Sequence, residues 1–395
     1  MNYSTRLVAL GDITTELSDG LHKAPVFYPG AEYIFVNATN LENGRIVDKE
    51  PAKHTNHEEY KKYGVPLSDR TILYSIDGTI GNIARYRGEK VVLGKGACYI
   101  NVDQSCDVDY IYYQLQSPLF ADYIRSMATG STIRHISLRT MRNYVFSLPP
   151  ISLQKRVASI LSSIDRRIEN NSQINDNLEQ QATVYFYHQF IVNADPSWRE
   201  GTISDLGTVV GGGTPSKAKA EYYADNGIAW ITPKDLSVDK SKFIAHGAND
   251  ITELGLRNSS ATIMPAGTVL FSSRAPIGYI AIADGEVTTN QGFKSVVPSS
   301  NVGTAFVYFF LKHALPTIEN MASGSTFKEI SGSAMRTVPA MIPDDDSLLE
   351  FSAFCEPLFQ QQRTLEAENR SLSALRDSLL PKLMSGEIDV SDVTI

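Results

Sequence analysis

The sequence has few cysteines and no long apolar run. Cys98, Cys106 and Cys355 are its three cysteines, and none stands in a Cys-x-x-Cys pair. This scarcity excludes a disulfide framework and a zinc knot, and it is typical of reduced thiols. No stretch approaches the roughly 20 apolar residues of a membrane span, and the first residues lack the apolar centre of a secretory signal. We therefore expect a cytoplasmic globular protein.

The sequence also lacks the motifs of a self-sufficient enzyme. There is no Asn-Pro-Pro-Tyr or Asp-Pro-Pro-Tyr segment, which methylation of adenine would use. The Gly88 to Gly96 segment has the wrong spacing for a phosphate loop and no Ser or Thr after its lysine. His54 and His57 have no second ligand pair nearby, which favours a surface cluster over a metal site. Asp48, Glu59 and Lys61 only loosely imitate a nuclease set. These absences predict a binding and assembly protein with no metal or cofactor of its own.

An excess of positive charge is missing as well. The net charge is −8, whereas a protein that binds nucleic acid normally presents a basic face. Residues 1–150 are balanced, with 16 basic and 16 acidic side chains, so the acidity lies mostly beyond them. Any basic surface must be local or must come from a partner subunit.

What the sequence does contain is a long internal repeat. The segment from Met127 to Thr132 returns as Met321 to Thr326, and the segment from Thr71 to Ala84 returns as Thr268 to Ala281. The offsets are about 194 and 197 residues, and the order of the segments is kept. A repeat of this period changes the interpretation of the whole chain. It predicts two similar domains with two similar sites that can diverge separately.

Each copy has the same predicted order of elements. Alternating apolar segments bounded by Gly and Pro predict strands at residues 32–37, 71–76, 91–93, 228–232 and 268–272. A helical stretch follows in each copy, at 110–127 and 305–321, and Pro118 or Pro316 should kink or split it. A Gly-Ser-Thr turn, an extended segment and a proline stop come next.

Beyond each proline stop the sequence predicts a long helix. Residues 153–190 contain no Gly or Pro, and residues 348–380 contain only Pro357. Apolar side chains recur at heptad spacing and predict a narrow seam, formed by Leu161, Ile164, Ile168 and Leu178 in the first helix and by Phe354, Leu358, Leu365, Leu372, Leu375 and Leu379 in the second. Asn171, Asn175, Gln361 and Glu368 take polar seam positions. Either each helix lies on its own domain, or the two pack on each other as a spacer about 57 Å long.

The chain resembles the specificity subunit of a Type I restriction-modification system over essentially its whole length. The resemblance is carried by Ser147 to Arg156, by Ile168 to Asn171, by Leu375 to Ile388 and by the Gly-Ser-Thr turns. One departure is the Asp344 to Ser347 segment, where the family usually has a second proline. The resemblance implies an α+β fold in which two pseudo-repeated α/β target recognition domains are joined by two long helices packed as an antiparallel coiled coil. The expected division is 1–150, 151–195, 196–346 and 347–395.

The resemblance also implies a function and partners. The two recognition domains would read two half-sites of an asymmetric bipartite target in double-stranded DNA, and the helices would dock two methyltransferase subunits. Those partners would bring S-adenosylmethionine. The resemblance leaves open whether restriction subunits also join the complex. A self-contained DNA-modifying enzyme with a cryptic site and a scaffold that binds no DNA remain the alternatives. Methylation or cleavage of DNA by the chain alone would favour the self-contained enzyme. Absence of DNA affinity in the assembled complex would favour the scaffold.

Residues that could contact DNA are expected at three places in each copy. Base edges are read by Arg, Lys, Asn, Gln, Ser and Thr, and such residues follow the predicted strands at Asn37, Thr39, Asn40, Thr232 and Lys234. The Gly-Ser-Thr turns and the residues after them add Ser131, Thr132, Arg134, Ser325, Thr326 and Lys328, as phosphate contacts or as plain fold. Asp77 and Arg274 occupy matching places and differ in charge, so either could determine specificity.

Overall fold

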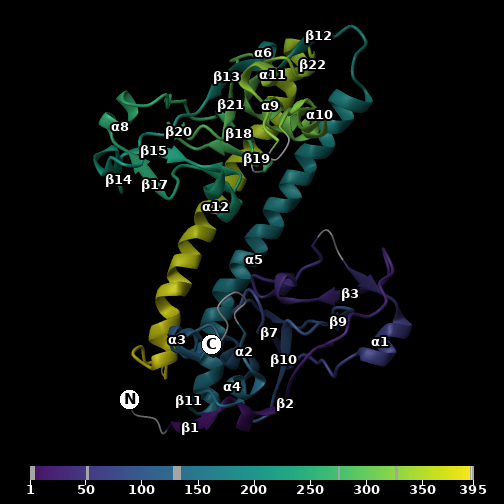
Figure 1. The fold of residues 1–395 in the computed structure, drawn as a ribbon, viewed down its shortest axis with the longest axis vertical. Coiled ribbons are helices and arrows are strands. Elements are labelled where there is room, and N and C mark those ends of the chain that lie inside the picture. Colours follow the sequence, from purple (N-terminus) through teal and green to yellow (C-terminus); the bar gives the residue numbers. More distant parts are fainter. Residues whose placement is uncertain are drawn as a thin grey trace. The chain divides into compact units, whose positions relative to one another are not determined.

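The computed structural model describes residues 5–49, 53–127, 135–274, 276–324, 328–391 and 393. The chain forms two compact units: unit 1 comprises Met1–Arg167 and Ser371–Ile395, and unit 2 comprises Ile168–Arg370. The two long helices, α5 (Ile151–Tyr187) and α12 (Asp345–Ser385), each contribute to both units. Figure 1 shows each unit as a sheet domain beside these helices.

Unit 1 is built on a four-stranded antiparallel sheet in the order β2-β10-β7-β8. Its strands are β2 (Thr14–Asp19), β7 (Thr71–Ser75), β8 (Ile83–Arg85) and β10 (Ala97–Val102). The central strand β10 is buried along its whole length. A smaller sheet, β6-β3-β9, contains β3 (Tyr33–Val36), β6 (His54–Thr55) and β9 (Val91–Leu93), and β4 (Leu41–Glu42) pairs with β5 (Arg45–Ile46).

The remaining elements of unit 1 connect the sheet to the long helices. Strand β1 (Arg6–Ala9) pairs with β11 (Val145–Leu148), which leads directly into α5. The short helices are η1 (Leu10–Ile13), η2 (Ala38–Asn40), α1 (His57–Tyr63), α2 (Val108–Gln114), α3 (Pro118–Met127) and α4 (Leu138–Arg142). Phe120 and Tyr110 are buried in one apolar core with Leu161 of α5 and Leu383 of α12. Both long helices are therefore part of the core of unit 1.

Unit 2 repeats this topology with one additional strand in each of its two sheets. Its main sheet has the order β13-β21-β18-β19-β16, with β13 (Gly207–Gly211), β16 (Phe243–Ile244), β18 (Val269–Ser273), β19 (Ile277–Ala283) and β21 (Lys294–Pro298). The smaller sheet contains β14 (Tyr223–Ala224), β15 (Ile228–Ile231), β17 (Asn249–Ile251) and β20 (Thr288–Thr289). In both units the small sheet holds one parallel pair, β3 with β9 and β15 with β20.

The helices of unit 2 follow the same order as those of unit 1. Strand β12 (Arg199–Thr202) pairs with β22 (Pro339–Ile342), which leads into α12. The short helices are η3 (His188–Val192), α6 (Ile203–Leu206), η4 (Ala220–Tyr222), α7 (Pro233–Val238), α8 (Glu253–Arg257), α9 (Gly303–His313), α10 (Leu315–Met321) and α11 (Gly332–Arg336). The core of unit 2 joins Phe306 and Phe309 of α9 to Phe186 of α5 and Phe351 of α12.

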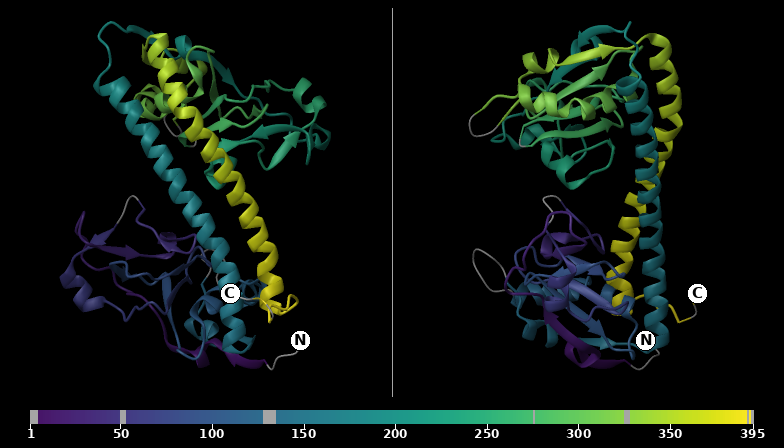
Figure 2. Two further views of the ribbon diagram at one scale, coloured as in Figure 1. Left: turned by 180° about the vertical axis from the view of Figure 1, so that it is seen from behind. Right: turned by 90° about the vertical axis from the view of Figure 1, so that its right-hand side faces the viewer.

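Helices α5 and α12 run side by side and antiparallel in each unit (Figure 2). In unit 2, the Tyr185 hydroxyl donates to Glu350 at 2.9 Å, and Asn171 near the other end donates to Glu368 at 3.0 Å. In unit 1, Arg376 of α12 pairs with Asp165 of α5 at 3.0 Å. The predicted pairing of the two helices is confirmed, and each helix packs on a sheet domain as well.

The heptad seam describes this packing only in part. Leu161, Ile164, Leu178 and Leu365 are buried, and Ile168, Leu358, Leu372 and Leu379 are half-buried. The placement of Leu375 and Gln361 in the seam is wrong, because Leu375 is 47% exposed and Gln361 is exposed. In unit 2, Phe351, Cys355, Phe359 and Gln362 are buried instead. Helix α12 contacts both α5 and the sheet domain there, so its buried stripe is wider than a coiled-coil seam.

Most predicted elements are present, with changes at the helix boundaries. The predicted strands appear as β3, β7, β9, β15 and β18. The predicted splits are confirmed, since α3 starts at Pro118 and α10 includes Pro316 close to its start. Helix α12 continues through Pro357, which therefore interrupts nothing. It begins at Asp345, and the preceding Asp344 accepts the Ser347 N–H at 2.8 Å. That backbone donor lowers the pKa of Asp344.

Candidate nucleic-acid interface

Several loops of unit 1 meet at one end of its main sheet. Strand β2 ends at Asp19, β7 ends at Ser75 and β10 begins at Ala97. The pairs Cys98–Asp19 and Ala97–Ser75 place these ends side by side. The parallel strands β3 and β9 end at the same place, since the Gly94 N–H donates to the Val36 carbonyl at 2.8 Å. We call this region the loop edge of unit 1, formed by residues 20–23, 37–40, 76–82, 94–96 and 135.

Unit 2 has a corresponding loop edge. Strand β13 pairs with β21 through Gly211 and Lys294, and Ser272 bridges to Phe293. The exit of the small sheet joins the same end, because the Asn290 N–H donates to the Ile231 carbonyl at 3.0 Å. The loop edge of unit 2 comprises residues 212–214, 232–235, 274, 276, 290–292, 328 and 329. Loops from five separate parts of the sequence therefore meet at one edge in each unit.

One buried serine shapes the same turn in both units. The Ser75 hydroxyl donates to the Thr79 carbonyl at 2.6 Å and accepts the Asn82 N–H at 2.8 Å. Ser272 makes the matching bonds, to the Pro276 carbonyl at 2.8 Å and from the Tyr279 N–H at 2.7 Å. These bonds satisfy the backbone of a tight turn. The sequence repeat over this segment thus preserves a loop conformation.

The residues two positions after these serines form side-chain pairs in which the acidic and the basic partner exchange places. In unit 1, Asp77 bonds His135 at 2.5 Å. In unit 2, Arg274 pairs with Glu329 at 3.4 Å, and Lys294 approaches the same carboxylate at 3.6 Å. Each pair links the serine turn to the segment preceding α4 or α11. Asp77 and Arg274 therefore hold two loops together, whatever else they contact.

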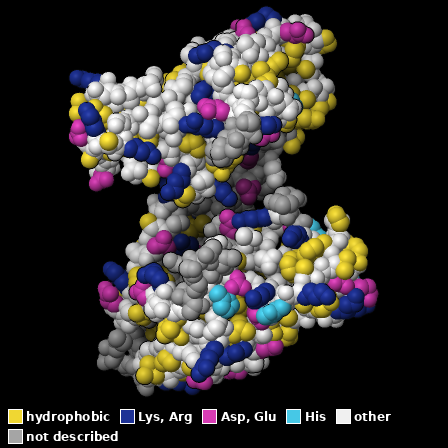
Figure 3. Space-filling view, viewed as in Figure 1, with side chains coloured by type: hydrophobic (Ala, Val, Ile, Leu, Met, Phe, Trp, Pro, Cys, Tyr) yellow, Lys and Arg dark blue, Asp and Glu magenta, His cyan; other side chains and the backbone are white. Residues whose placement is uncertain are grey.

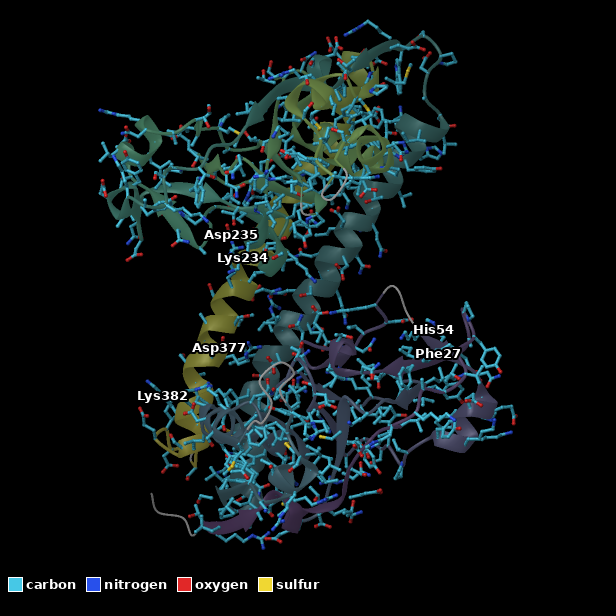
Figure 4. The ribbon with its side chains drawn as sticks, in the orientation of Figure 1. Phe27, His54, Lys234, Asp235, Asp377 and Lys382 are labelled. Carbon is cyan, nitrogen blue, oxygen red and sulfur yellow. The ribbon has the colours of Figure 1, made fainter. Side chains whose placement is uncertain are left out.

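The predicted strand-exit residues also bond within the protein. The Asn40 amide accepts the Asn37 N–H at 3.0 Å and donates to the Val47 carbonyl at 3.1 Å. The Thr232 hydroxyl donates to Asp235 at 2.7 Å at the start of α7. Thr39 and Lys234 are exposed, and Figure 4 shows Lys234 beside Asp235 on this helix. Exposure leaves Thr39 and Lys234 as the accessible members of this group.

Part of the predicted set lies outside the described residues, namely Ser131, Thr132, Arg134, Ser325 and Thr326. Lys328 is described and exposed. Sequence reasoning did not single out another group of polar residues at the loop edges, consisting of His22, Thr214, Gln291 and Lys294, and it considered Lys95 only as part of a phosphate loop. A repeat search does not find them because their surroundings differ between the copies. Only strand pairing reveals that they share an edge.

A buried ion network fixes the sheet domain of unit 2 to the helices. Lys242 is 7% exposed, pairs with Glu179 of α5 and donates to Gln362 of α12 at 2.7 Å. Glu179 also pairs with Lys312 of α9 at 2.5 Å. Burial lowers the pKa of Lys242, opposed by Glu179. Burial acts to raise the pKa of Glu179, but the two lysines outweigh it and the pKa is lowered.

Unit 1 uses a simpler polar attachment. The Tyr113 hydroxyl donates to Asp165 of α5 at 2.7 Å, and the same carboxylate pairs with Arg376 of α12. Gln154 at the start of α5 accepts the Asp107 N–H at 2.8 Å. Polar groups at such positions select one register of helix and domain. Each loop edge is thus carried on a domain fixed to the helices within its own unit.

The histidine and acidic motifs have structural roles. His54 pairs with Asp48 at 2.9 Å, and His57 bonds the Tyr33 hydroxyl at 2.9 Å. Glu59 is buried and accepts the Val26 N–H at 3.0 Å. Within the described ranges, no three His, Cys, Asp or Glu side chains form a cluster that could hold a metal ion. Among the described helices, none combines the length and apolar character needed to cross a bilayer.

Charge on the visible surface differs from what the net charge suggests. Lys and Arg side chains are spread among Asp and Glu over the face of unit 2 shown in Figure 3. Beside the loop edge of this unit, the Lys294 side chain and the Arg336 guanidinium lie close to Gly332. A Cβ atom on Gly332 would be within 3.8 Å of both. Lys294 and Arg274 both approach the Glu329 carboxylate in the segment before α11. Three cationic side chains therefore lie near this edge of an acidic protein, and two of them pair with one carboxylate.

Comparison with known proteins gives a consistent result. The family model for the Type I restriction modification DNA specificity domain matches twice, at residues 7–180 and 196–366. The MjaIX specificity subunit of Methanocaldococcus jannaschii is 40% identical over 151 residues, 38% of this chain and 35% of that protein. The HindI specificity subunit of Haemophilus influenzae is 22% identical over 71% of this chain and 77% of its own length. The chain thus spans about a third of the first relative and about three quarters of the second.

The fold is found in a solved structure. An S subunit of a Type I restriction-modification system from M. genitalium superposes with a TM-score of 0.60. The alignment covers 99% of this chain and 98% of that chain at 18% sequence identity. The likeness therefore extends over both sheet domains and both long helices.

Proposed function

The chain belongs to the Type I restriction-modification DNA specificity family, and from this premise we propose that it selects a bipartite, asymmetric target in double-stranded DNA. Each loop edge contacts one half-site. The observation that carries the proposal is the difference between the two edges on one common frame. The serine turn is the same in both units, whereas the ion pair beside it is reversed from Asp77–His135 to Arg274–Glu329.

The chemistry of such an edge suits DNA. Base edges are read by amide, hydroxyl and cationic side chains, and phosphates are held by Lys and Arg. Unit 2 offers Lys294, Arg336 and the exposed Lys234 near its loop edge. The loops stand on buried strands, and a rigid support of this kind is what precise readout requires.

The strand pairing defines a clean exchange that tests this function. Residues 1–150 include both β1 and β11, which pair with each other, and end just before α5. Replacing them with the same region of one of the relatives above should change one half-site of the methylated motif and leave the other. Methylome sequencing of a host carrying the exchange gives the result. If both half-sites change together, the two edges form a single composite site and the proposal is wrong.

We further propose that the helices bind two methyltransferase subunits, which bring S-adenosylmethionine and perform the reaction. Exposed apolar side chains on the C-terminal halves of both helices support this. Val184 and Tyr187 of α5 are 66% and 53% exposed, and Leu375 of α12 is 47% exposed. A groove of about 770 Å³ beside Val184 is lined by polar and aromatic side chains, including Tyr185 of α5, His188 of η3 and Phe354 of α12. Exposed apolar surface of this kind marks an interaction site.

Each docking surface can be removed separately. Val184→Asp and Leu375→Asp should each reduce the complex from two methyltransferase subunits to one, because a charge there must lose its water on binding. The double variant should bind none. Native mass spectrometry of the co-expressed complex gives the count, and Ser172→Asp, on an exposed position of α5, is the control. Two bound subunits in the double variant would contradict the assignment of these surfaces.

A further inference from the structure

We propose that Gln291 in unit 2 and Lys95 in unit 1 each read one base edge of their half-site. The inference rests on the proposed function and identifies specificity-determining residues within it. Both residues occupy the middle of the loop that joins the small sheet to the central strand, at 94–96 and 290–292. Both side chains are exposed.

The two positions are structurally equivalent. The Gly96 carbonyl accepts the Ile76 N–H at 3.1 Å, and the Gly292 carbonyl accepts the Ser273 N–H at 2.7 Å. On the other side of each loop, the Leu93 carbonyl accepts the Leu21 N–H at 2.7 Å and the Thr289 carbonyl accepts the Gly213 N–H at 2.9 Å. The backbone therefore follows one path in both units, while the side chain it displays differs.

Close backbone packing holds this loop in place. A Cβ atom on Gly94 would lie 2.3 Å from the Asn37 Oδ1, and one on Gly212 would lie 1.9 Å from the Asn290 carbonyl oxygen. Both distances are far below a van der Waals contact. Glycine at these two positions therefore allows the neighbouring loops of each loop edge to pack closely against one another. The result is a fixed backbone that presents the side chains of Lys95 and Gln291 at the surface.

The two side chains are chemically suited to different bases. A glutamine amide can bond an adenine through both its oxygen and its nitrogen, and a lysine donates to the acceptors of guanine. The Thr214 hydroxyl donates to the Gln291 Oε1, which orients the amide. The Gln291 backbone carbonyl lies 3.5 Å from the Lys294 ammonium. These contacts preorganise the glutamine and leave its oxygen able to accept a second bond.

The charged pairs nearby are weaker candidates for the same role. Asp77 and Arg274 bond His135 and Glu329, and these bonds would have to break before a base could replace the partner. Gln291 can contact a base without losing a loop contact. The Asp77–His135 and Arg274–Glu329 pairs then position the loops of each loop edge, and Lys95 and Gln291 contact the bases.

The test uses the complex co-expressed with its methyltransferase subunits and a DNA library randomised at both half-sites. Gln291→Ala should remove the preference at one base pair, by about 5- to 150-fold in relative affinity, and leave the other half-site unchanged. Gln291→Lys should move that preference from adenine toward guanine, and Lys95→Gln should make the opposite change in the other half-site. Gln104→Ala, an exposed glutamine beyond the opposite end of β10, is the control.

Two results would overturn the inference while leaving the proposed function standing. One is an unchanged preference at every position in both the Gln291 and the Lys95 variants. The other is an even loss of affinity for all sequences, which indicates a phosphate contact. If the unaltered complex shows no sequence preference in either half-site, the proposed function itself fails, and this inference fails with it.

Discussion

Replacing Glu179 with alanine is expected to lower the free energy of unfolding of unit 2 by about 3 kcal/mol. Lys242 is 7% exposed, and Glu179 is the carboxylate that pairs with it. The Lys242 ammonium also donates to the neutral Gln362, and the Phe359 ring centroid lies 4.1 Å from it. The Glu366 carboxylate bonds the Lys242 backbone N–H at 2.8 Å and not the ammonium. Loss of Glu179 therefore leaves the buried ammonium without the carboxylate that pairs with it directly, which costs more than the pair itself contributes.

The measurement can be confined to unit 2. The chain has two tryptophans, Trp198 and Trp230, and both lie in this unit. Urea unfolding followed by tryptophan fluorescence thus reports on unit 2. Glu350→Ala, which removes an exposed bond to Tyr185, is the matched control and should cost less than about 1 kcal/mol. Equal losses for the two variants would show that the network is not stabilising.

The loss in the Glu179 variant should depend on pH. Burial lowers the pKa of Lys242 from its ordinary 10.5, and removing the carboxylate lowers it further. A lysine with a depressed folded-state pKa destabilises the protein while it is charged, and the cost falls as pH rises through that pKa. The variant should therefore recover part of its stability as the pH is raised. This recovery should begin at a lower pH than any corresponding change in the wild type. A difference that stays constant from neutral to alkaline pH would contradict this cause.

The architecture was predictable because its signals are long. Two repeated segments give the two domains, a run free of Gly and Pro gives α5, and a run interrupted only by proline gives α12. The register of α12 was not predictable, because Leu375 and Phe359 are both apolar and only tertiary packing decides which is buried. Phe359 meets Phe243 of the sheet domain, whereas Leu375 is 47% exposed. A helix that packs on two partners at once does not keep a simple heptad.

The candidate interface was only half predictable for a different reason. Asp77 and Arg274 stand in a repeated segment, so comparison of the copies reveals that they differ. Lys95 and Gln291 stand where the copies share little sequence, and their equivalence rests on backbone hydrogen bonds. Likewise, Asn40 has the right chemistry to read a base, but its amide bonds Asn37 and Val47. The sequence shows which side chains could hydrogen-bond a base. It does not show which of them already make hydrogen bonds within the protein.

Lengthening the two long helices is expected to change the distance between the two DNA half-sites. Helices α5 and α12 cross from one compact unit to the other between Arg167 and Ile168 and between Arg370 and Ser371. If the helix pair sets the spacing, both helices must be lengthened together, because Gln362 and Glu368 of α12 bond α5 at Asn175 and Asn171. An insertion at the α5 crossing alone would put these unit 2 contacts one turn out of register with the Asp165–Arg376 pair of unit 1. Insertions at both crossing points leave each unit's own contacts intact.

Four residues inserted at each crossing should add about 6 Å to the helix pair. That length is close to two base-pair steps of about 3.4 Å, and four residues make nearly one helical turn, so the buried stripes stay close to phase. The methylated motif should gain about two spacer bases while both half-sites keep their sequences. Methylome sequencing measures this, and the insertion in α5 alone is the control, expected to lose methylation. Should the complex that contains the doubly lengthened chain methylate DNA with the original spacer, the helices do not determine the distance between the half-sites.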